Sequence, residues 1–543
     1  MKLFKMKIRF YVLLIVLAIG GACNTKSDTQ DLSQLLELVS GDSLSDHIRY
    51  LASDKLKGRL PGTPEYGEAM DYVIGKLNKM GVEPAGDGSG YTQLVTIRNA
   101  KINDGNSFLE WNGKMLSANE DYYFIGNLNE VNTEIPESEV IFAGYGINSP
   151  NYDDFSLVNV ENKVMLVLLG SPESLTSSEL AHFSNWETKY RTAADKGAVG
   201  ILFINSNPST DSTFLRRANS ASLRGNYGVT GENGEAFGRR VFPEGLKFSA
   251  VLNSISLASK ELDSVISDYR ENKIVGQSLG SIRVKTESIF SEFQSANIVG
   301  RIEGSDNTLK DEYIVHTAHL DHVGIGRPLD GDSIYNGAHD NASGVASLLE
   351  IARLYQSLEK KQKRSILFVL VTAEEMGLLG SDYFTTYPTI PIESIVANVN
   401  TDMPTLIAPL LSIEPLGAEH STIMNEVKAA ADILDLEIMP DHMPDEVRFV
   451  RSDQYNFIKK GIPALHVKYG LKSANPNEDL SNTIRNYTRN VYHKPSDEWN
   501  DLFDFDAGEV YVKCNFLISY HLANNPEKPA WNADSFFNPV NQK

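Results

Sequence analysis

The sequence contains little cysteine and too few basic residues for a nucleic-acid-binding protein. It has only two cysteines, Cys23 and Cys514, among 543 residues, and if Cys23 carries a lipid neither can be part of a Cys-based zinc site. Its 71 acidic residues exceed its 50 basic residues, which gives a formal net charge of −21. Nucleic-acid binding requires a basic surface, and we therefore expect no such partner. Hydrophobic residues make up 41% of the chain, enough for a globular core.

The sequence also lacks an apolar run long enough to cross a membrane at its N-terminus. The run from Phe10 to Ile19 is shorter than the ~20 residues that a span needs, and basic residues precede it, as in a signal peptide. It leads to Gly20-Gly21-Ala22-Cys23, which resembles a bacterial lipoprotein signal, although Gly20 stands where that signal usually has Leu. We expect residues 1–22 to be removed.

The expected product is an exported protein that faces the periplasm or the cell exterior. A lipid on Cys23 would be its only attachment to the membrane, with simple secretion as the alternative. Cys514 would then have no disulfide partner, so stability must come from the core.

The pattern of apolar and polar residues divides the rest of the chain into different regions. Residues 43–97 and 291–525 contain apolar strands and amphipathic helices in alternation, typical of an α/β fold with a mostly parallel central sheet flanked by helices. Residues 98–290 consist of short β-like runs separated by Asn, Ser, Gly and Pro, which predicts a β-rich insertion. A polar tether at 23–42 and a polar C-terminal tail at 526–543, expected to lie over the surface, complete the chain.

One predicted central strand ends at two acidic residues. Ile366 to Thr372 is apolar or β-favouring at every position, as in a parallel strand covered on both faces. Glu374 and Glu375 follow, and ligands of open α/β sheets bind outside the carboxyl ends of strands. Adjacent acids after a strand are more often a solvated turn, so this pair alone does not establish a site.

Two other predicted strands end in the same way. The strand at 313–318 leads to His319 and Asp321, and the strand in SIVANVNTDM leads to Asp402. His316 lies within its strand, and we expect it to be a packed side chain rather than a ligand. Nine of the 11 histidines lie at or beyond His316, which places metal or acid–base chemistry in the C-terminal half.

The remaining candidates complete a donor set for two divalent metals. Asp340 precedes an amphipathic helix, whose positive end favours the ionised carboxylate. His493, in NVYHKPSDEW, supplies a second imidazole. Two imidazoles and three carboxylates can hold two ions if one carboxylate bridges. Such donors without thiolate suit zinc, and manganese or cobalt would also fit.

The motifs occur in the order of a known family. They are His319-x-Asp321, Gly337-x-x-Asp340-Asn341-Ala342-Ser343-Gly344, Glu374-Glu375, Asn400-x-Asp402-Met403 and Tyr492-His493. The set resembles the co-catalytic zinc aminopeptidases of metallopeptidase family twenty-eight, which also includes glutamate carboxypeptidase-like enzymes. The resemblance implies two Zn²⁺ ions per chain, the first held by His319 and Asp402, the second by Glu375 and His493, with Asp340 bridging them.

The resemblance also implies roles for three further residues. Glu374 would be the general base, Asp321 would orient His319, and Tyr492 is a candidate donor to the oxyanion. We expect the two glutamates to diverge because neighbouring residues of extended chain point opposite ways. The chain departs from the family at His339, where a second Asp is common, and at Gln454, where His is common.

A second resemblance concerns the region 98–290. The segments FAGYGINSPNYDDF, NKVMLVLLG and AADKGAVGILFI follow the order of a protease-associated domain. Such domains are non-catalytic and are expected to limit substrate access.

The expected activity is removal of N-terminal amino acids from peptide substrates. Acids near the motifs would hold the substrate amine, and the candidates are Asp330, Asp332, Asp445 and Glu446. A carboxypeptidase remains an alternative, with the substrate carboxylate held by Arg327, Arg448 or Arg451. A glutaminyl cyclase-like enzyme with one zinc and a non-catalytic, receptor-like binding protein are further alternatives.

Overall fold

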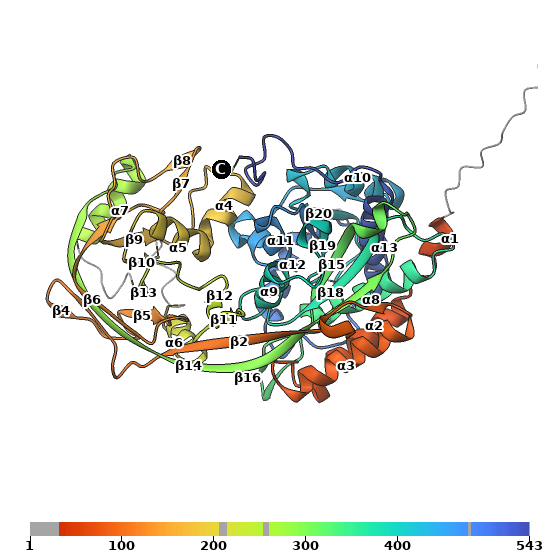
Figure 1. Cartoon of the computed structure of the whole chain (residues 1–543), viewed down its shortest axis with the longest axis horizontal. Coiled ribbons are helices and arrows are strands. Elements are labelled where there is room, and N and C mark those ends of the chain that lie inside the picture. Colours follow the sequence, from red (N-terminus) through yellow and green to blue (C-terminus); the bar gives the residue numbers. More distant parts are fainter. Residues whose placement is uncertain (1–31, 206–213, 254–259, 405, 476–478, 542–543) are drawn as a thin grey trace, which may run out of the picture.

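The computed structural model in Figure 1 has two lobes, each built around a β-sheet. It describes residues 32–205, 214–253, 260–404, 406–475 and 479–541. The predicted signal peptide and Cys23 lie outside these residues. None of the helices within the described part of the chain is both long and apolar enough to cross a membrane.

The larger sheet has four adjacent parallel strands at its centre. In spatial order they are β18 (Ser365–Val371), β15 (Tyr313–His319), β19 (Ile395–Asn400) and β22 (Ala464–Tyr469). Antiparallel strands flank them: β14 (Ser278–Ile302), followed by β2 (Thr92–Ile102), β11 (Asn226–Thr230) and β12 (Ala236–Phe237), on one side, and β20 (Ser412–Leu416) on the other. The predicted α/β class with a mostly parallel sheet is confirmed.

Strand β18 is apolar along nearly its whole length because both faces of the sheet are covered. Ile366, Phe368 and Leu370 belong to one hydrophobic cluster, and the alternate residues Leu367, Val369 and Val371 belong to another. The first cluster includes residues of α2 (Gly41–Leu51), α3 (Pro64–Lys79), α8 (Ser343–Gln356), α10 (Ile423–Leu434) and α13 (Phe505–Asn524). The second includes residues of α9 (Leu379–Thr386) and α11 (Gln454–Lys459). Burying each such side chain contributes roughly 1.5–3 kcal/mol.

The smaller sheet is formed mainly by the predicted insertion. Its strands lie in the order β4 (Lys114–Met115), β3 (Phe108–Trp111), β14, β6 (Asn132–Phe142), β9 (Val164–Leu168), β10 (Gly200–Ile204), β13 (Phe248–Leu252) and β5 (Tyr122–Ile125). Two hydrophobic clusters line this sheet, with α7 (Lys260–Asn272) in one and α5 (Trp186–Asp195) and α6 (Phe214–Arg224) in the other. Its assignment as a protease-associated domain stays a prediction.

Strand β14 belongs to both sheets and joins the lobes (Figure 1). Its first part pairs with β3 and β6, and its last part pairs with β18. Between them, Ser288 to Ile298 pair with the whole of β2. Strands β2 and β14 therefore run through the expected limits at 97/98 and 290/291 without interruption.

Two further segments connect the lobes. Helix α4 (Ser177–Ser184) leaves the insertion and packs on short turns of the larger lobe. The C-terminal tail crosses the same area, where Trp531 Nε1 donates to the carbonyl of Gly461 at 2.8 Å. Phe537 is buried, and its ring centroid lies 5.6 Å from that of His182 in α4.

Candidate metal centre

The candidate ligands come together at the carboxyl ends of the central strands. His319 is the last residue of β15, Asp402 follows β19 by two residues, and Glu375 lies in the turn after β18. Asp340 lies in the turn η5 (Ala338–Ala342), directly before α8, and His493 follows α12 (Leu480–Asn490). The rule that strand ends of one parallel sheet meet at one edge thus explains why residues distant in sequence are neighbours.

One group of possible ligands contains His319, Asp340 and Asp402. His319 Nε2 lies 3.2 Å from Asp340 Oδ1 and 3.4 Å from Asp402 Oδ1. All three residues are buried. Their ligand atoms lie close enough together to hold one metal ion.

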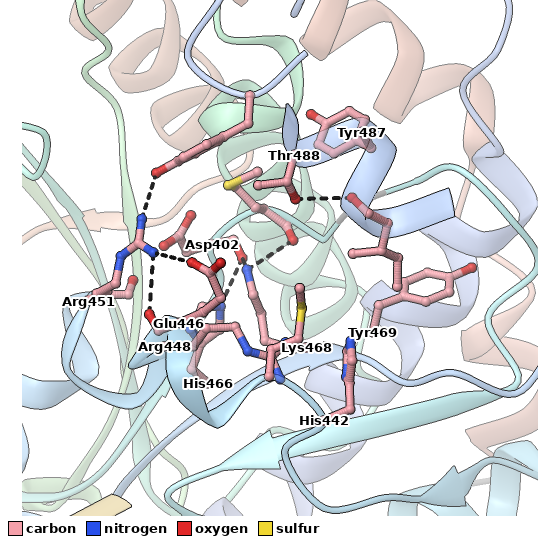
Figure 2. Close-up of a pocket in the computed structure, with 15 residues that line it drawn as sticks. Asp402, His442, Glu446, Arg448, Arg451, His466, Lys468, Tyr469, Tyr487 and Thr488 are labelled. Atoms are coloured by element: carbon pink, nitrogen blue, oxygen red, sulfur yellow. Dashed lines mark hydrogen bonds and ion pairs between the residues drawn. The ribbon is translucent and has the colours of Figure 1, made fainter. Parts of the chain in front are cut away.

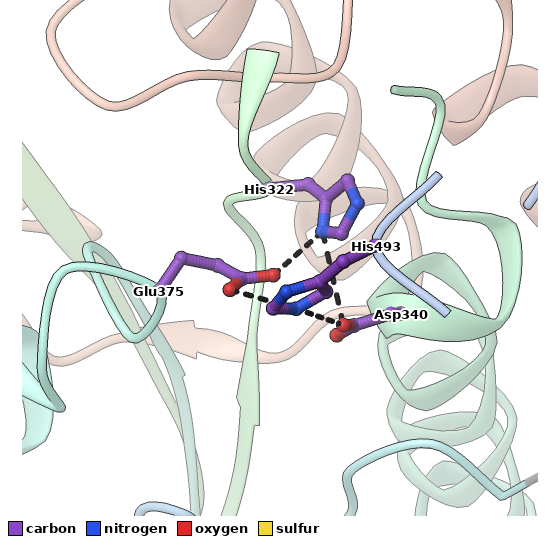
Figure 3. A group of neighbouring side chains, drawn as sticks. All are labelled: His322, Asp340, Glu375 and His493. Carbon is purple, nitrogen blue, oxygen red and sulfur yellow. Dashed lines mark ion pairs between the residues drawn. The ribbon is translucent and has the colours of Figure 1, made fainter. Parts of the chain in front are cut away.

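A second group shares Asp340 with the first (Figure 3). His493 Nε2 lies 3.0 Å from Asp340 Oδ2 and 3.0 Å from Glu375 Oε2. His322 faces the same carboxylates, with Nδ1 2.7 Å from Glu375 Oε1. Each oxygen of Asp340 therefore faces a different group.

The residues fit divalent metal ions. The buried ligand atoms Glu375 Oε1, Asp402 Oδ1 and His493 Nε2 make only the ion-pair contacts described above and no hydrogen bond, although buried polar atoms normally have one. Imidazole and carboxylate donors without thiolate match zinc. The two groups, with Asp340 common to both, are the arrangement expected for a pair of ions.

The electrostatics separate Glu374 from the other carboxylates. Burial alone would raise the pKa of Asp340, but His319 and His493 outweigh it and hold that pKa well below its usual range. Burial would also raise the pKa of Glu375, but the positive charge of His493 lowers it to about 2. Glu374 is half-buried beside Glu375 and Asp402, and desolvation of its carboxyl group together with these negative charges raises its pKa well above the ordinary value. Of these three carboxyl groups, only that of Glu374 has a raised pKa.

Asp321 positions both neighbouring motifs. Its backbone carbonyl lies 3.1 Å from His319 Nδ1. Its carboxylate accepts hydrogen bonds from the backbone N–H of Glu374, at 3.1 Å, and of Glu375, at 3.3 Å. The carboxylate also lies 3.9 Å from His319 Nδ1 through its Oδ1, so Asp321 contacts His319 with both main chain and side chain while its carboxylate fixes the turn of the two glutamates.

The expectation that Glu374 and Glu375 diverge because the chain is extended was wrong. The residues lie in a turn, after Ala373 with a φ of +54°. The carboxylate of Glu375 is directed at His493 and His322 by this turn and by the hydrogen bonds from Asp321, not by strand alternation.

Three supporting residues were missed in the sequence. His322 follows Asp321 directly, so a further imidazole was visible within the same motif. Asp497, which is fully buried, accepts from the backbone N–H of His339 at 3.0 Å and of Asp340 at 3.1 Å. Arg59 is fully buried and donates to the carbonyls of Leu320, Asn336 and Gly337, at 2.9, 2.6 and 3.0 Å. No local pattern signals Arg59 or Asp497, because their partners are distant in sequence.

The two departures from the family pattern do not face the ligand atoms. His339 stacks on Phe503, with ring centroids 4.0 Å apart, and its Nδ1 lies 3.2 Å from Asp497 Oδ1. Gln454 accepts from Asn400 Nδ2 at 3.0 Å and donates to the carbonyl of Phe449 at 2.8 Å. Gln454 therefore supports the strand end that leads to Asp402.

A pocket of about 130 Å³ adjoins Asp402 and Tyr492 (Figure 2). Its apolar lining includes Met403, Met443, Tyr469, Ile484 and Tyr487. Tyr492 stacks on His493, with ring centroids 3.9 Å apart, and its hydroxyl accepts from Arg451 Nη2 at 3.3 Å. The pocket is therefore continuous with the candidate metal centre.

Only some of the charged candidates for substrate binding line this pocket. Glu446, Arg448 and Arg451 do, whereas Arg327, Asp330, Asp332 and Asp445 are exposed and do not. Arg327 belongs to β16 (Gly324–Leu329), and Asp332 begins β17 (Asp332–Tyr335), which pairs with it.

Curated relatives match parts of this chain. A probable zinc metalloprotease of Pyrenophora tritici-repentis is 27% identical over 269 residues, which are 45% of this chain and 60% of that protein. Aminopeptidase YwaD of Bacillus subtilis is 27% identical over 180 residues, 31% of this chain and 36% of that protein. The chain thus spans less than two thirds of the length of these relatives.

The fold and the site region both match known peptidases. An aminopeptidase from Aneurinibacillus sp. strain AM-1 superposes with a TM-score of 0.50 at 16% identity, covering 93% of this chain and 98% of that one. At this identity the likeness shows the fold alone. Residues 297–509, which contain every candidate ligand, match peptidase family M28, and this part of the chain is accordingly a peptidase M28 family domain.

Proposed function

We propose that this protein is a zinc-dependent aminopeptidase that removes residues from the free N-termini of peptides. The observation that carries the proposal is the position of Asp340 between two imidazoles. Its Oδ1 lies 3.2 Å from His319 Nε2, and its Oδ2 lies 3.0 Å from His493 Nε2. A carboxylate with one oxygen toward each group is suited to bridge two metal ions.

Each ion would have its own pair of ligands besides Asp340. His319 and Asp402 would hold one zinc ion, and Glu375 and His493 would hold the other. When bound, the two ions supply Lewis-acid polarisation of the peptide carbonyl and lower the pKa of water. His322, 2.7 Å from the second oxygen of Glu375, supports that carboxylate.

Glu374 is the proposed general base. Its raised pKa, caused mainly by burial, suits a carboxylate that must accept a proton during the reaction. It would take the proton of the attacking water and pass it to the nitrogen of the leaving amine. Asp321 positions this residue through the hydrogen bond to its backbone N–H.

Tyr492 is the proposed donor to the developing oxyanion. The guanidinium of Arg451 donates to its hydroxyl oxygen, which leaves the phenolic hydrogen to point toward the substrate carbonyl oxygen. Stacking on His493 fixes the ring beside the metal centre. A donor held in position before the reaction stabilises the oxyanion without reorganisation.

The charges of the pocket favour a free amine over a free carboxylate. Arg448 is paired with both Glu414 and Asp441, and Arg451 lies 3.3 Å from Glu446. Lys468 donates to the carbonyls of Asp402 and Met403 at 2.9 and 3.4 Å. Because these cations already have partners, they are weak candidates for holding a substrate carboxylate. Besides the proposed metal ligand Asp402, the acid that lines the pocket is Glu446, whose partner is Arg451.

The rest of the chain would bring the enzyme out of the cytoplasm and limit the access of substrates to its site. We infer that the insertion at 98–290 is a protease-associated domain without catalytic residues, and that Cys23 carries the lipid of an exported protein. The substrates would then be peptides outside the cytoplasm.

The test of the activity is hydrolysis of aminoacyl anilides by the full-length, zinc-loaded protein. A free aminoacyl anilide should be cleaved and its N-acetyl form should not, and a C-terminally amidated dipeptide should be cleaved as well as the free dipeptide. Comparable cleavage of the acetylated substrate, or loss of activity on amidation alone, would contradict the aminopeptidase assignment. One zinc per chain would favour a glutaminyl cyclase-like enzyme, and two zincs without turnover a binding protein.

A further inference from the structure

One wall of the pocket is an irregular segment, residues 441–451. It contributes His442, Met443, Glu446, Arg448 and Arg451 to the lining. Its only regular structure is two single turns, η8 (Pro444–Glu446) and η9 (Arg448–Val450), separated by Val447 at a φ of +48°. A β-branched residue rarely adopts this conformation, so contacts from outside the segment must maintain its shape.

Two carboxylates hold the segment at Arg448. Glu414, in β20, is fully buried and lies 2.5 Å from Arg448 Nη2 through one oxygen, while its other oxygen pairs with His442. Asp441 pairs with the same Arg448 nitrogen and also accepts from the backbone N–H of Met443 at 2.9 Å. Charge-assisted contacts from two sides fix the direction of the arginine.

The second of these carboxylates is held from the other lobe. Ser177, the first residue of α4, donates from Oγ to Asp441 Oδ2 at 2.8 Å. Helix α4 begins with a capping box formed by Thr176 and Glu179, which orders this end of the helix. Figure 1 shows α4 between the two lobes.

Helix α4 is docked firmly enough to act as a fixed support. His182 Nδ1 lies 2.7 Å from the hydroxyl of Tyr455, and its ring packs edge-on against Phe536 and Phe537 of the C-terminal tail. Ala181 is a member of the hydrophobic cluster on the face of the larger sheet that α9 and α11 cover. These contacts leave Ser177 little freedom relative to Asp441.

We propose that Ser177 is a positioning residue of the substrate pocket, through which α4 holds the Asp441–Arg448 pair and so the wall that selects the terminal side chain of the substrate. The proposal rests on the exopeptidase function proposed above. It gives the insertion a role in selectivity although, within the described part of the chain, none of the residues that line this pocket comes from 98–290.

The consequence differs between substrates. A large side chain contacts the wall at 441–451, so a loosened wall should weaken its binding, whereas an alanyl substrate should be little affected. The candidate metal ligands lie on other elements, and the chemical step should therefore remain the same.

The experiment compares Ser177→Ala with Ser178→Ala and Ser177→Thr in the full-length, zinc-loaded protein. Ser178 lies on the same helix, but its partner Glu419 does not line the pocket. For leucyl and phenylalanyl anilides we expect Ser177→Ala to raise KM about three- to tenfold. This change corresponds to part of the free energy that a hydrogen bond to a charged group contributes. The kcat, the zinc content and the KM for alanyl anilide should stay at the wild-type values, and both control variants should resemble the wild type.

A second measurement does not depend on turnover. Backbone hydrogen exchange of the peptide covering 441–451 should be faster in Ser177→Ala than in the wild type, and unchanged in Ser178→Ala. Unchanged exchange and unchanged KM would overturn the proposal, as would an equal effect of both alanine variants or a loss confined to kcat. If the wild type cleaves no anilide, but exchange at 441–451 is still faster in Ser177→Ala than in the wild type, the proposed function is contradicted and the positioning role of Ser177 is not.

Discussion

Protonation of His316 should make the protein sensitive to acid. His316 lies in β15, is fully buried, and stacks on Phe368 with ring centroids 5.6 Å apart. Neither ring nitrogen has a hydrogen-bond partner. Burial therefore lowers the pKa of His316 from 6.5 to about 3.

The sign and size of the effect follow from linkage. The unfolded chain binds this proton below pH 6.5 and the folded protein does not, so the free energy of unfolding falls as the pH falls from about 6.5 toward 3. At pH 5 the loss should be about 2 kcal/mol relative to pH 7, since each pKa unit corresponds to about 1.4 kcal/mol.

The assay is urea unfolding at pH 7 and pH 5 of the wild type, His316→Leu and Val315→Ala. The decrease between the two pH values should be about 2 kcal/mol smaller in His316→Leu than in the wild type. A change in packing affects a variant equally at both pH values, and protonation of the metal centre affects all three proteins equally. Both effects therefore cancel when the decreases in the free energy of unfolding are compared. Val315→Ala, a buried non-titrating change on the same strand, should show the wild-type decrease. An equal decrease in all three proteins would refute the reasoning.

Three further predictions concern the proposed site and the membrane anchor. Glu374→Gln should keep two zincs per chain and lose turnover by a factor of roughly 10²–10⁴, measured with an aminoacyl anilide, and activity within about tenfold of the wild type would exclude Glu374 as general base. Asp340→Ala should lose zinc by metal analysis while the neighbouring His339→Asn keeps it, and two zincs in Asp340→Ala would contradict bridging. Cys23→Ser should move the protein from the membrane fraction to the soluble fraction, because a lipid contributes ~0.8 kcal/mol per buried CH₂, and persistent membrane association would contradict the lipid anchor.

Much of the site could be predicted because it follows from strand ends. The run at 366–372 became β18, and the strands before His319 and Asp402 were also found. Apolar residues at every position indicate burial on both faces, and parallel strands bring their carboxyl ends to one edge. Local sequence therefore contained enough information to locate His319, Glu375 and Asp402 at this edge.

The missing parts depend on contacts between distant segments. Arg59 binds carbonyls at 320, 336 and 337, and a lone arginine before Leu60 and Pro61 gives no sign of this. The turn at Ala373 depends on the carboxylate of Asp321, which accepts both following backbone N–H groups. The hydrogen bond from Ser177 to Asp441 joins two lobes that the sequence shows only as separate regions with different residue patterns.

The long strand β14 also determines an order of events during synthesis. Strand β2 can complete its pairing only after the ribosome has released residues 288–298, and α2 and α3 need β15 and α8, which emerge later still. The smaller sheet, in contrast, needs no strand beyond the first part of β14. Because domains fold as units while the chain emerges, the lobe in the middle of the sequence should become compact first. The apolar faces of the amphipathic N-terminal helices α2 and α3 must wait until the C-terminal half is made.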